Sequence, residues 1–213
     1  MSKHLIVISL HRDEGFLTKG AEQLIEKLQQ MGEEVNTRNL YDLNFNAILT
    51  ATDFEALKSG KLPFDIAREQ GFIEEADYLW FIYPIWWTTM PAILKGYIDR
   101  VFLSGFAYRL ENDRPVGLLT DKKVIILNSM GMSREEYMLS GMFKAMELTI
   151  DIGIFEFTGM KVVAHKYFTS IMSANEHRRQ DYLDEIPELA YSLVNHRLKL
   201  EDPTDRKEIL RAN

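Results

Sequence analysis

The sequence predicts an α/β fold built on a parallel sheet. Five short apolar runs alternate along the chain with segments of helical periodicity, which is the pattern of strands joined by crossover helices. The runs are apolar on both faces, as strands of a buried parallel sheet are. The 213 residues contain no internal repeat and no linker, so we expect a single domain over residues 1–213 with right-handed crossovers.

The first half of the chain predicts a strand, loop, helix, strand unit, then a short helix and a third strand. Gly32 stands where a helix C-cap belongs, and Pro84 ends the third strand. The stretch 42–70 is the least regular, with an exposed loop at 58–63. The expected elements are a strand over 5–10, helix over 16–31, strand over 34–40, helix over 66–76 and strand over 78–83.

The second half continues the alternation. A helix with Pro91 in its first turn, where the missing N–H costs nothing, is followed by a strand whose core is Val124 to Leu127. Pro187 interrupts the last helical stretch, and the charged residues 201–213 form a tail. The expected elements are a helix over 90–102, strand over 122–127, helix over 134–149, strand over 161–168 and helix over 176–200.

Composition excludes several classes of function. The chain has 25 Lys and Arg against 32 Asp and Glu, a net charge of −7, which opposes binding to nucleic acid or to an anionic membrane. The absence of cysteine excludes disulfides, thiolate metal sites and cysteine nucleophiles, and fits a reducing compartment. The N-terminus runs directly into the first strand with no targeting or membrane segment, so we expect a cytoplasmic protein.

Three loops follow the carboxyl ends of predicted strands, where ligands bind in open parallel sheets: 11–18, 84–90 and 128–137. The first lacks both the dinucleotide and the P-loop fingerprint. Arg12, Gly15 and the start of the next helix can still hold a phosphate, although Asp13 and Glu14 oppose it. An ordinary solvated loop explains this segment equally well.

The second loop contains two adjacent tryptophans, Trp86 and Trp87. As a loop wall they offer a flat aromatic surface with backbone amides at its edge, which suits a planar heteroaromatic ligand. The alternative is that both are core residues that close the end of the sheet. The third loop, 128–133, is small and polar and either supplies amides to a ligand or only connects a strand to a helix. The five histidines are scattered without metal-ligand spacing, so no metal site is expected.

A long block of the chain runs from Tyr83 to Trp87, continues from Met90 to Phe102 and ends at Gly105 to Tyr108. This block resembles the NAD(P)H:quinone oxidoreductase (DT-diaphorase-like) family of flavodoxin-fold flavoproteins. Weaker similarity covers most of residues 4–185, including 40–46, 65–70 and 75–77. The resemblance implies a doubly wound flavodoxin-like sheet of strand order 2-1-3-4-5, with helices on both faces.

The resemblance also implies a flavin, a homodimer with each active site at the subunit interface, and two-electron reduction of quinones by NADH or NADPH in a ping-pong cycle. Gln70 matches a position that holds the adenine end of FAD, which favours FAD over FMN, and Tyr137 matches a catalytic tyrosine near the pyrimidine edge of the flavin. The implied cofactor-binding residues are His11, Phe16, Leu17, Gln70, Pro84, Ile85, Trp86, Trp87, Thr88, Asn128, Ser129, Met130, Gly131 and Tyr137.

The chain departs from the family pattern in the loop 128–131, which stands where two threonines and two glycines are usual, and also at Phe143 and Leu17. Phe143 stands where a histidine is common, so Tyr137 lacks that histidine as a relay partner, and Leu17 stands where asparagine is frequent. Two alternatives share the same features: nitroreductase or azoreductase activity on the same flavin, and a soluble regulatory subunit of a potassium-efflux system. The choice between NADH and NADPH and the identity of the small electrophilic acceptor stay open.

Overall fold

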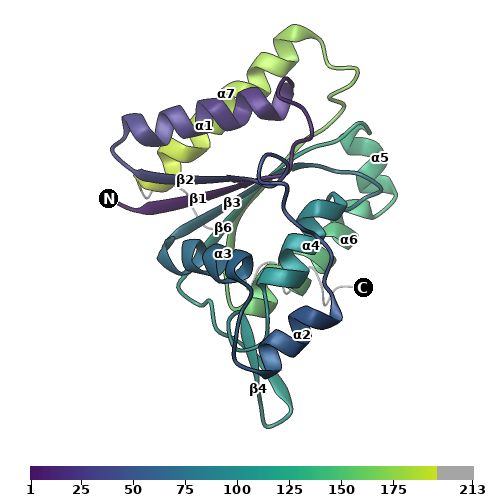
Figure 1. Ribbon diagram of the computed structural model, residues 1–213. Coiled ribbons are helices and arrows are strands. Elements are labelled where there is room, and N and C mark those ends of the chain that lie inside the picture. The colour runs from purple at the N-terminus through teal and green to yellow at the C-terminus, as the bar shows by residue number, and fades with distance from the viewer. Residues whose placement is uncertain (196–213) are drawn as a thin grey trace.

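The computed structural model describes residues 1–195 and shows a five-stranded parallel sheet of order β2-β1-β3-β6-β7 (Figure 1). The predicted fold class and strand order are therefore confirmed. Each strand pairs in parallel with its neighbours, and β7 is an edge strand. The strands are β1 (Lys3–Ile8), β2 (Glu34–Asn39), β3 (Tyr78–Pro84), β6 (Lys123–Ser129) and β7 (Lys161–Phe168).

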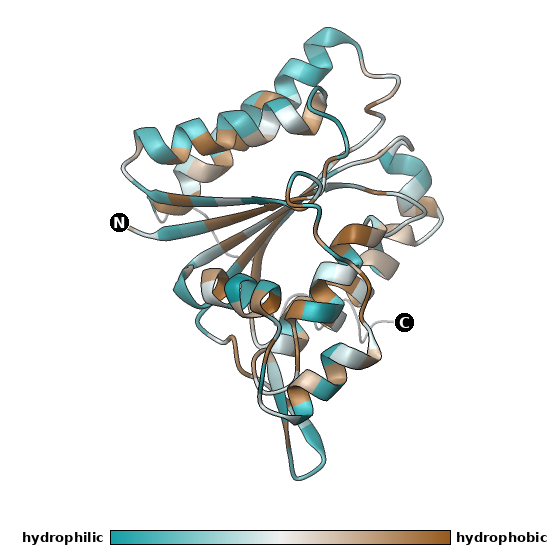
Figure 2. Ribbon diagram, in the orientation of Figure 1, coloured by the Kyte–Doolittle hydropathy of each residue, from teal (hydrophilic) through white to brown (hydrophobic). Residues whose placement is uncertain are grey.

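Helices cover both faces of the sheet. On one face α1 (Phe16–Gln30) and α7 (Glu176–Val194) lie side by side over Trp80 and Ile125. The other face carries α3 (Phe64–Glu75), α4 (Ala92–Val101) and the segment that follows β6. Figure 2 shows hydrophobic strands between helices whose outer faces are hydrophilic. The two apolar clusters, one on each face, hold the carboxyl ends of the strands at one edge.

The predicted helix over 134–149 is wrong as a single element. The chain forms α5 (Arg134–Leu139), then α6 (Met142–Met146), then a π-helix, η1 (Glu147–Phe155), and a 3₁₀ turn, η2 (Glu156–Thr158). Gly141 has φ 73°, a left-handed conformation that ends the first helix and restarts the chain in a new direction. The π-helix is a rare form that is often found at functional sites.

Pro187 lies inside α7 and does not end it. Leu183 and Ile186 are buried against α1, so tertiary packing holds the helix together across the proline. The predicted continuation to residue 200 and the charged tail over 201–213 lie outside the described residues.

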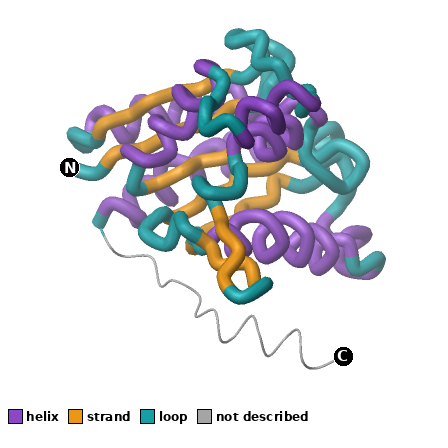
Figure 3. Tube along the Cα trace, turned by 60° about the horizontal axis from the view of Figure 1, so that its bottom comes forward, coloured by secondary structure: helices purple, strands orange, loops and turns teal. Residues whose placement is uncertain are grey.

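Two elements were not predicted: α2 (Ala51–Lys58) and an antiparallel hairpin of β4 (Tyr108–Glu111) and β5 (Arg114–Gly117). The hairpin stands out from the rest of the molecule in Figure 3. Asn112 and Asp113 join its strands with positive φ values of 50° and 60°, the geometry of a tight two-residue hairpin turn. Within residues 1–195, the helices all fall short of the length and apolarity that crossing a bilayer requires.

Candidate functional site

A cavity of about 360 Å³ opens at the carboxyl ends of the central strands. Four parts of the chain line it: the loop after β1, the last residue of β3, the last residue of β6, and the residues between β7 and the first turn of α7. The first three belong to the segments that the sequence predicts as ligand-binding. Its lining residues are Leu10, His11, Arg12, Glu14, Gly15, Phe16, Leu17, Thr18, Pro84, Ser129, Ile171, Met172 and Arg179.

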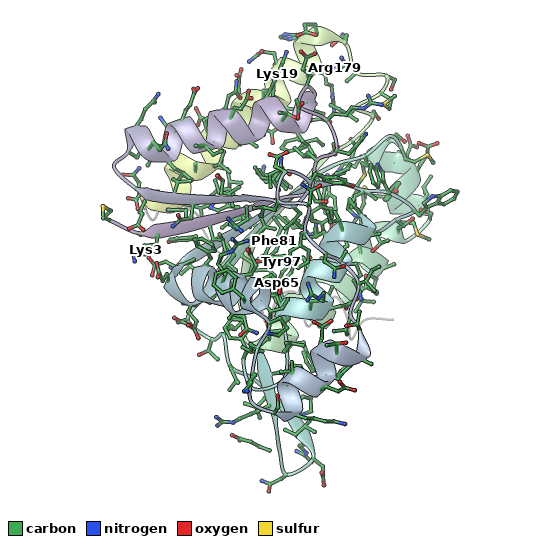
Figure 4. All side chains as sticks on the ribbon, viewed as in Figure 1. Lys3, Lys19, Asp65, Phe81, Tyr97 and Arg179 are labelled. Carbon is green, nitrogen blue, oxygen red and sulfur yellow. The ribbon has the colours of Figure 1, made fainter. Side chains whose placement is uncertain are left out.

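One end of the cavity is suited to an anion. Helix α1 begins after Gly15 with no side-chain cap and no acidic residue in its first turn, so the first backbone N–H groups of the helix are available to a ligand. Arg179 lines the same cavity; one of its terminal nitrogens donates to the Ile171 carbonyl at 3.2 Å, and its buried Nε has no partner among the described residues. Figure 4 shows Arg179 near Lys19, where α1 and α7 begin. An uncapped helix start and an unsatisfied buried guanidinium nitrogen together fit a phosphate group.

The loop after β3 is a strained turn. Trp86 and Thr89 exchange two backbone hydrogen bonds of 3.0 and 3.1 Å around a two-residue turn. The two residues between them, Trp87 and Thr88, have φ values of 50° and 61°, the left-handed region that a β-branched residue such as threonine rarely adopts. Backbone strain of this kind is concentrated at functional sites. The turn leaves the amides of Trp87 and Thr88 without a hydrogen-bond acceptor among residues 1–195.

We expect Thr88→Gly to raise the free energy of unfolding by about 1 kcal/mol, because glycine adopts a left-handed φ without the Cβ clash. Urea denaturation measures the change. The matched control is Thr89→Gly in the same loop: Thr89 is not among the residues with positive φ, so that change should leave stability unchanged or lower it. A loss of stability in Thr88→Gly would show that the turn is not strained at this residue.

The two tryptophans are not core residues, so the alternative that both close the end of the sheet is wrong. Trp86 is 39% exposed and Trp87 is 98% exposed. Trp86 packs against His11, with ring centroids 5.2 Å apart, and so stands beside the cavity. Trp87 extends into solvent and does not line the cavity, so the two indoles do not form one continuous wall.

The third predicted loop begins two residues later than expected, because Asn128 and Ser129 are the last residues of β6. Asn128 is buried, and its side-chain amide donates to the Tyr83 carbonyl at 3.1 Å. The Ile85 amide donates to the Ser129 carbonyl at 2.8 Å. Together these bonds join the loop after β3 to the loop after β6.

Several expected cofactor-binding residues have side chains that are buried or packed against neighbours. Ile85 and Met130 are buried in the apolar cluster beneath the loops, so only their backbone is available to a ligand. Gly131 lies in the loop after β6, next to Met172. Tyr137 is nearly buried on α5 and packs on Phe143 with ring centroids 5.3 Å apart.

Gln70 does not lie with the other predicted site residues. It is buried in α3, and its side-chain amide donates to the Val101 carbonyl at 2.9 Å. It is absent from the lining of the cavity. The side-chain amide thus joins α3 to the end of α4, and we do not include Gln70 in the proposed cofactor site.

Sequence reasoning missed Leu10, Ile171, Met172 and Arg179 as cavity residues. The last three follow β7 or begin α7, on the same sheet edge as the three predicted loops. A signal was present: the pair Arg178 and Arg179 stands at the start of the last predicted helix, just after a strand. Treating the loop after the fifth strand like the other three would have included them.

The fold and the cavity together define the class of protein. The family model described as flavodoxin-like fold matches residues 2–189, and the chain belongs to this family.

Comparison with individual relatives narrows the class. The chain is 34% identical over 182 residues to an uncharacterized NAD(P)H oxidoreductase of Haemophilus influenzae, covering 85% of this chain and 90% of that protein. It is 32% identical over 187 residues to NAD(P)H dehydrogenase (quinone) 1 of Rattus norvegicus, covering 78% and 68%. The solved NAD(P)H:quinone oxidoreductase of Methanothermobacter marburgensis superposes with a TM-score of 0.81 at 27% identity, covering 90% and 98%. The resemblance stated from the sequence is thereby confirmed.

Proposed function

We propose that the protein is a flavin-dependent NAD(P)H:quinone oxidoreductase. The observation that carries the proposal is the cavity at the sheet edge, which has an anion-binding end at α1 and Arg179 and lies beside the strained, indole-bearing turn after β3. A flavin has this combination of a phosphate tail and a flat ring. The quinone reductases among the relatives support the choice of reaction.

We propose FAD as the flavin. The support is that the cavity continues past the start of α1 on both sides. A neighbouring hollow of about 320 Å³ shares Leu10, Arg12 and Thr18 with it, and another of about 330 Å³ shares Gly15 and Arg179. Either hollow gives room for a second nucleotide half beyond the first phosphate. Mass spectrometry of the released cofactor distinguishes FAD from FMN.

Each residue has a defined task in this proposal. When bound, the flavin supplies the redox chemistry, accepting a hydride from a nicotinamide and passing it to a quinone. The α1 amides and Arg179 bind the phosphate end, and Trp86 with Pro84 orients the ring. The amides of Trp87, Thr88 and Gly131 donate to the polar rim. Tyr137 is the proposed side-chain donor at the ring.

We further propose a homodimer with the active site at the subunit interface. Large apolar side chains stay exposed around the site, and a second copy of the chain would cover them. They are Trp87, Met132, Met138, Leu139 and Met172. Analytical ultracentrifugation of the wild type and of Leu139→Glu tests this part, and we expect the substitution to weaken the dimer.

The test of the function begins with the absorption spectrum of the isolated protein. We expect flavin absorption, released on denaturation, and turnover of a quinone with NADH or NADPH. A nitroaromatic and an azo dye in the same assay separate the quinone reductase from a nitroreductase or azoreductase. A protein that takes up neither FAD nor FMN would contradict the proposal, and binding without turnover would favour a regulatory role, including that of a potassium-efflux subunit.

We expect Arg179→Gln to weaken flavin binding by about ten- to a hundredfold, because a charge-assisted hydrogen bond to a phosphate contributes about 1.5–3 kcal/mol. Quenching of flavin fluorescence on titration measures the affinity. The matched control is Arg178→Gln: Arg178 is the neighbouring arginine, does not line the cavity and donates to the Tyr182 hydroxyl at 2.8 Å. Equal losses in the two variants would remove Arg179 from the site.

A further inference from the structure

A buried chain of three polar side chains lies directly behind the two ligand-facing loops. His165 of β7 contacts Asp151 of the π-helix through Nδ1 at 2.7 Å and Asn128 of β6 through Nε2 at 2.6 Å. The histidine and aspartate side chains are only 4% and 3% exposed. The row of side chains ends on the Tyr83 carbonyl, three residues before Trp86 of the strained turn, through the amide of Asn128.

The hydrogen bonds determine where the protons lie. The Tyr83 carbonyl can only accept, so the Asn128 Nδ2 must face it and the Asn128 Oδ1 must face His165. An amide oxygen also only accepts, so His165 must carry a proton on Nε2. The Asp151 carboxylate accepts in the same way at Nδ1. With Asp151 ionised, both ring nitrogens face acceptors, which is the arrangement of an imidazolium; the Tyr167 hydroxyl also lies 3.1 Å from Nδ1.

We propose that His165 is a positioning residue: an imidazolium, paired with Asp151, that fixes the amide of Asn128 and directs positive charge toward the candidate flavin site. This proposal rests on the proposed function and deepens it. The ion pair is oriented, with its cationic end toward the loops after β3 and β6 and its anionic end toward the π-helix. In a buried setting such a dipole favours negative charge at the loops.

A row of packed aromatic rings connects His165 with Tyr137. Phe143 packs between Tyr137 and Tyr167, with ring centroids 5.3 and 4.8 Å away, and Tyr167 stacks on His165 at 4.0 Å. Two rings therefore separate His165 from Tyr137. His165 acts through Asn128 and not by contact with Tyr137.

His165 and Asp151 line a groove of about 760 Å³ beside the edge strand. Burial raises the pKa of the Tyr83 phenol, and the charge of Asp151 raises it further, so that tyrosine stays neutral. The titratable and charged groups that face His165 or share its groove are Arg134, Lys144, Glu147, Asp151, Lys166, Tyr167, Arg178, Tyr182, Glu185 and, from β3, Tyr83.

The first experiment measures protonation without any cofactor. In protein with ¹⁵N-labelled histidine at pH 7, we expect one ring to show two similar nitrogen shifts, the pattern of an imidazolium, and His165→Gln to remove that signal. Asp151→Asn should convert it to the widely split shifts of a neutral tautomer. The control is His177→Gln, which removes the signal of a histidine that is 88% exposed. A neutral tautomer for His165 in the wild type would overturn the proposal.

The second experiment measures the effect on the bound flavin. We expect His165→Gln and Asp151→Asn each to lower the affinity for reduced relative to oxidised flavin by about fivefold, read as a more negative midpoint potential, with no change in His177→Gln. An unchanged ratio in folded His165→Gln would overturn the proposal. If no flavin binds to the wild type, the proposed function fails, and with it the role at the flavin, while the nitrogen shifts still decide the protonation of His165.

Discussion

Gly96→Ala is expected to lower the free energy of unfolding by about 3 kcal/mol or more. Alanine is normally the better helix former by about 1 kcal/mol, but Gly96 faces the loop before α2 at a distance that no side chain permits. A Cβ at this position would lie 2.1 Å from the carbonyl oxygen of Ala47 and 2.5 Å from its Cβ. Because the obstacle is backbone, α4 or the loop must move, and α4 directly follows the indole-bearing turn.

The same substitution at Gly71 is the matched control. Gly71 lies within α3, and a Cβ built there meets nothing within 4 Å. We expect Gly71→Ala to stabilise the protein by about 0.5–1 kcal/mol, because only the helix propensity changes. Urea denaturation of both variants gives two changes of opposite sign. A small effect at Gly96 would show that α4 packs less closely on the loop than the structure indicates.

Much of the sheet could be predicted, because a strand buried on both faces is marked by a continuous apolar run. The residues at which the strands end could be predicted less well. The first strand ends at Ile8 instead of Leu10 because Asn39 and Ile82 are its last paired neighbours, and pairing is not visible in the run itself. The β4–β5 hairpin was missed because its strands are only four residues each and largely exposed; β4 alternates apolar and polar residues, but over too few positions to distinguish it from a loop.

The position of the candidate site could be predicted, but the orientation and partners of its side chains could not. Three loops were expected at one edge of the sheet because parallel strands bring their carboxyl ends together, and the cavity lies there. The direction in which the Trp87 side chain points depends on a left-handed turn, and no local residue preference predicts that turn. The partners of His165 come from β6 and from a π-helix that continues past the end of the helix expected over 134–149, so their contact could be found only in the tertiary structure.

Arg100 carries the other large effect on stability. It is buried at the end of α4 and joins three segments: it donates to Asp53 at 2.8 Å, to Asp65 at 2.7 Å and to the Asn46 carbonyl at 2.8 Å. Asp53 also accepts from the amide and the hydroxyl of Thr50, which starts α2. The guanidinium therefore holds α2, α3 and the preceding loop against α4.

We expect Arg100→Met to lower the free energy of unfolding by about 3–5 kcal/mol, because removing one partner of a buried ion pair leaves the carboxylate of Asp53 buried without its positive charge and with only the hydrogen bonds from Thr50. Lys95→Met is the control on the same helix. Its pair with Asp99 at 2.6 Å is solvent-exposed on both sides and should contribute less than about 1 kcal/mol. Similar losses of stability in the two variants would mean that the buried Arg100 pair contributes no more to the free energy of unfolding than the exposed Lys95 pair.

The dependence of this loss on pH identifies its origin. The hydrogen bond from Arg100 lowers the pKa of Asp53 below its ordinary value near 4. A carboxyl with a depressed folded pKa contributes stability that is complete above the unfolded pKa and is lost as pH falls toward the folded one. Without Arg100, burial acts on Asp53 in the opposite direction and favours its neutral form. The other acidic groups are common to both proteins. We therefore expect the difference in free energy of unfolding between wild type and Arg100→Met to become smaller as pH falls from 5 to 3. A difference that stays constant would mean that the loss comes from packing of the arginine side chain and not from its charge.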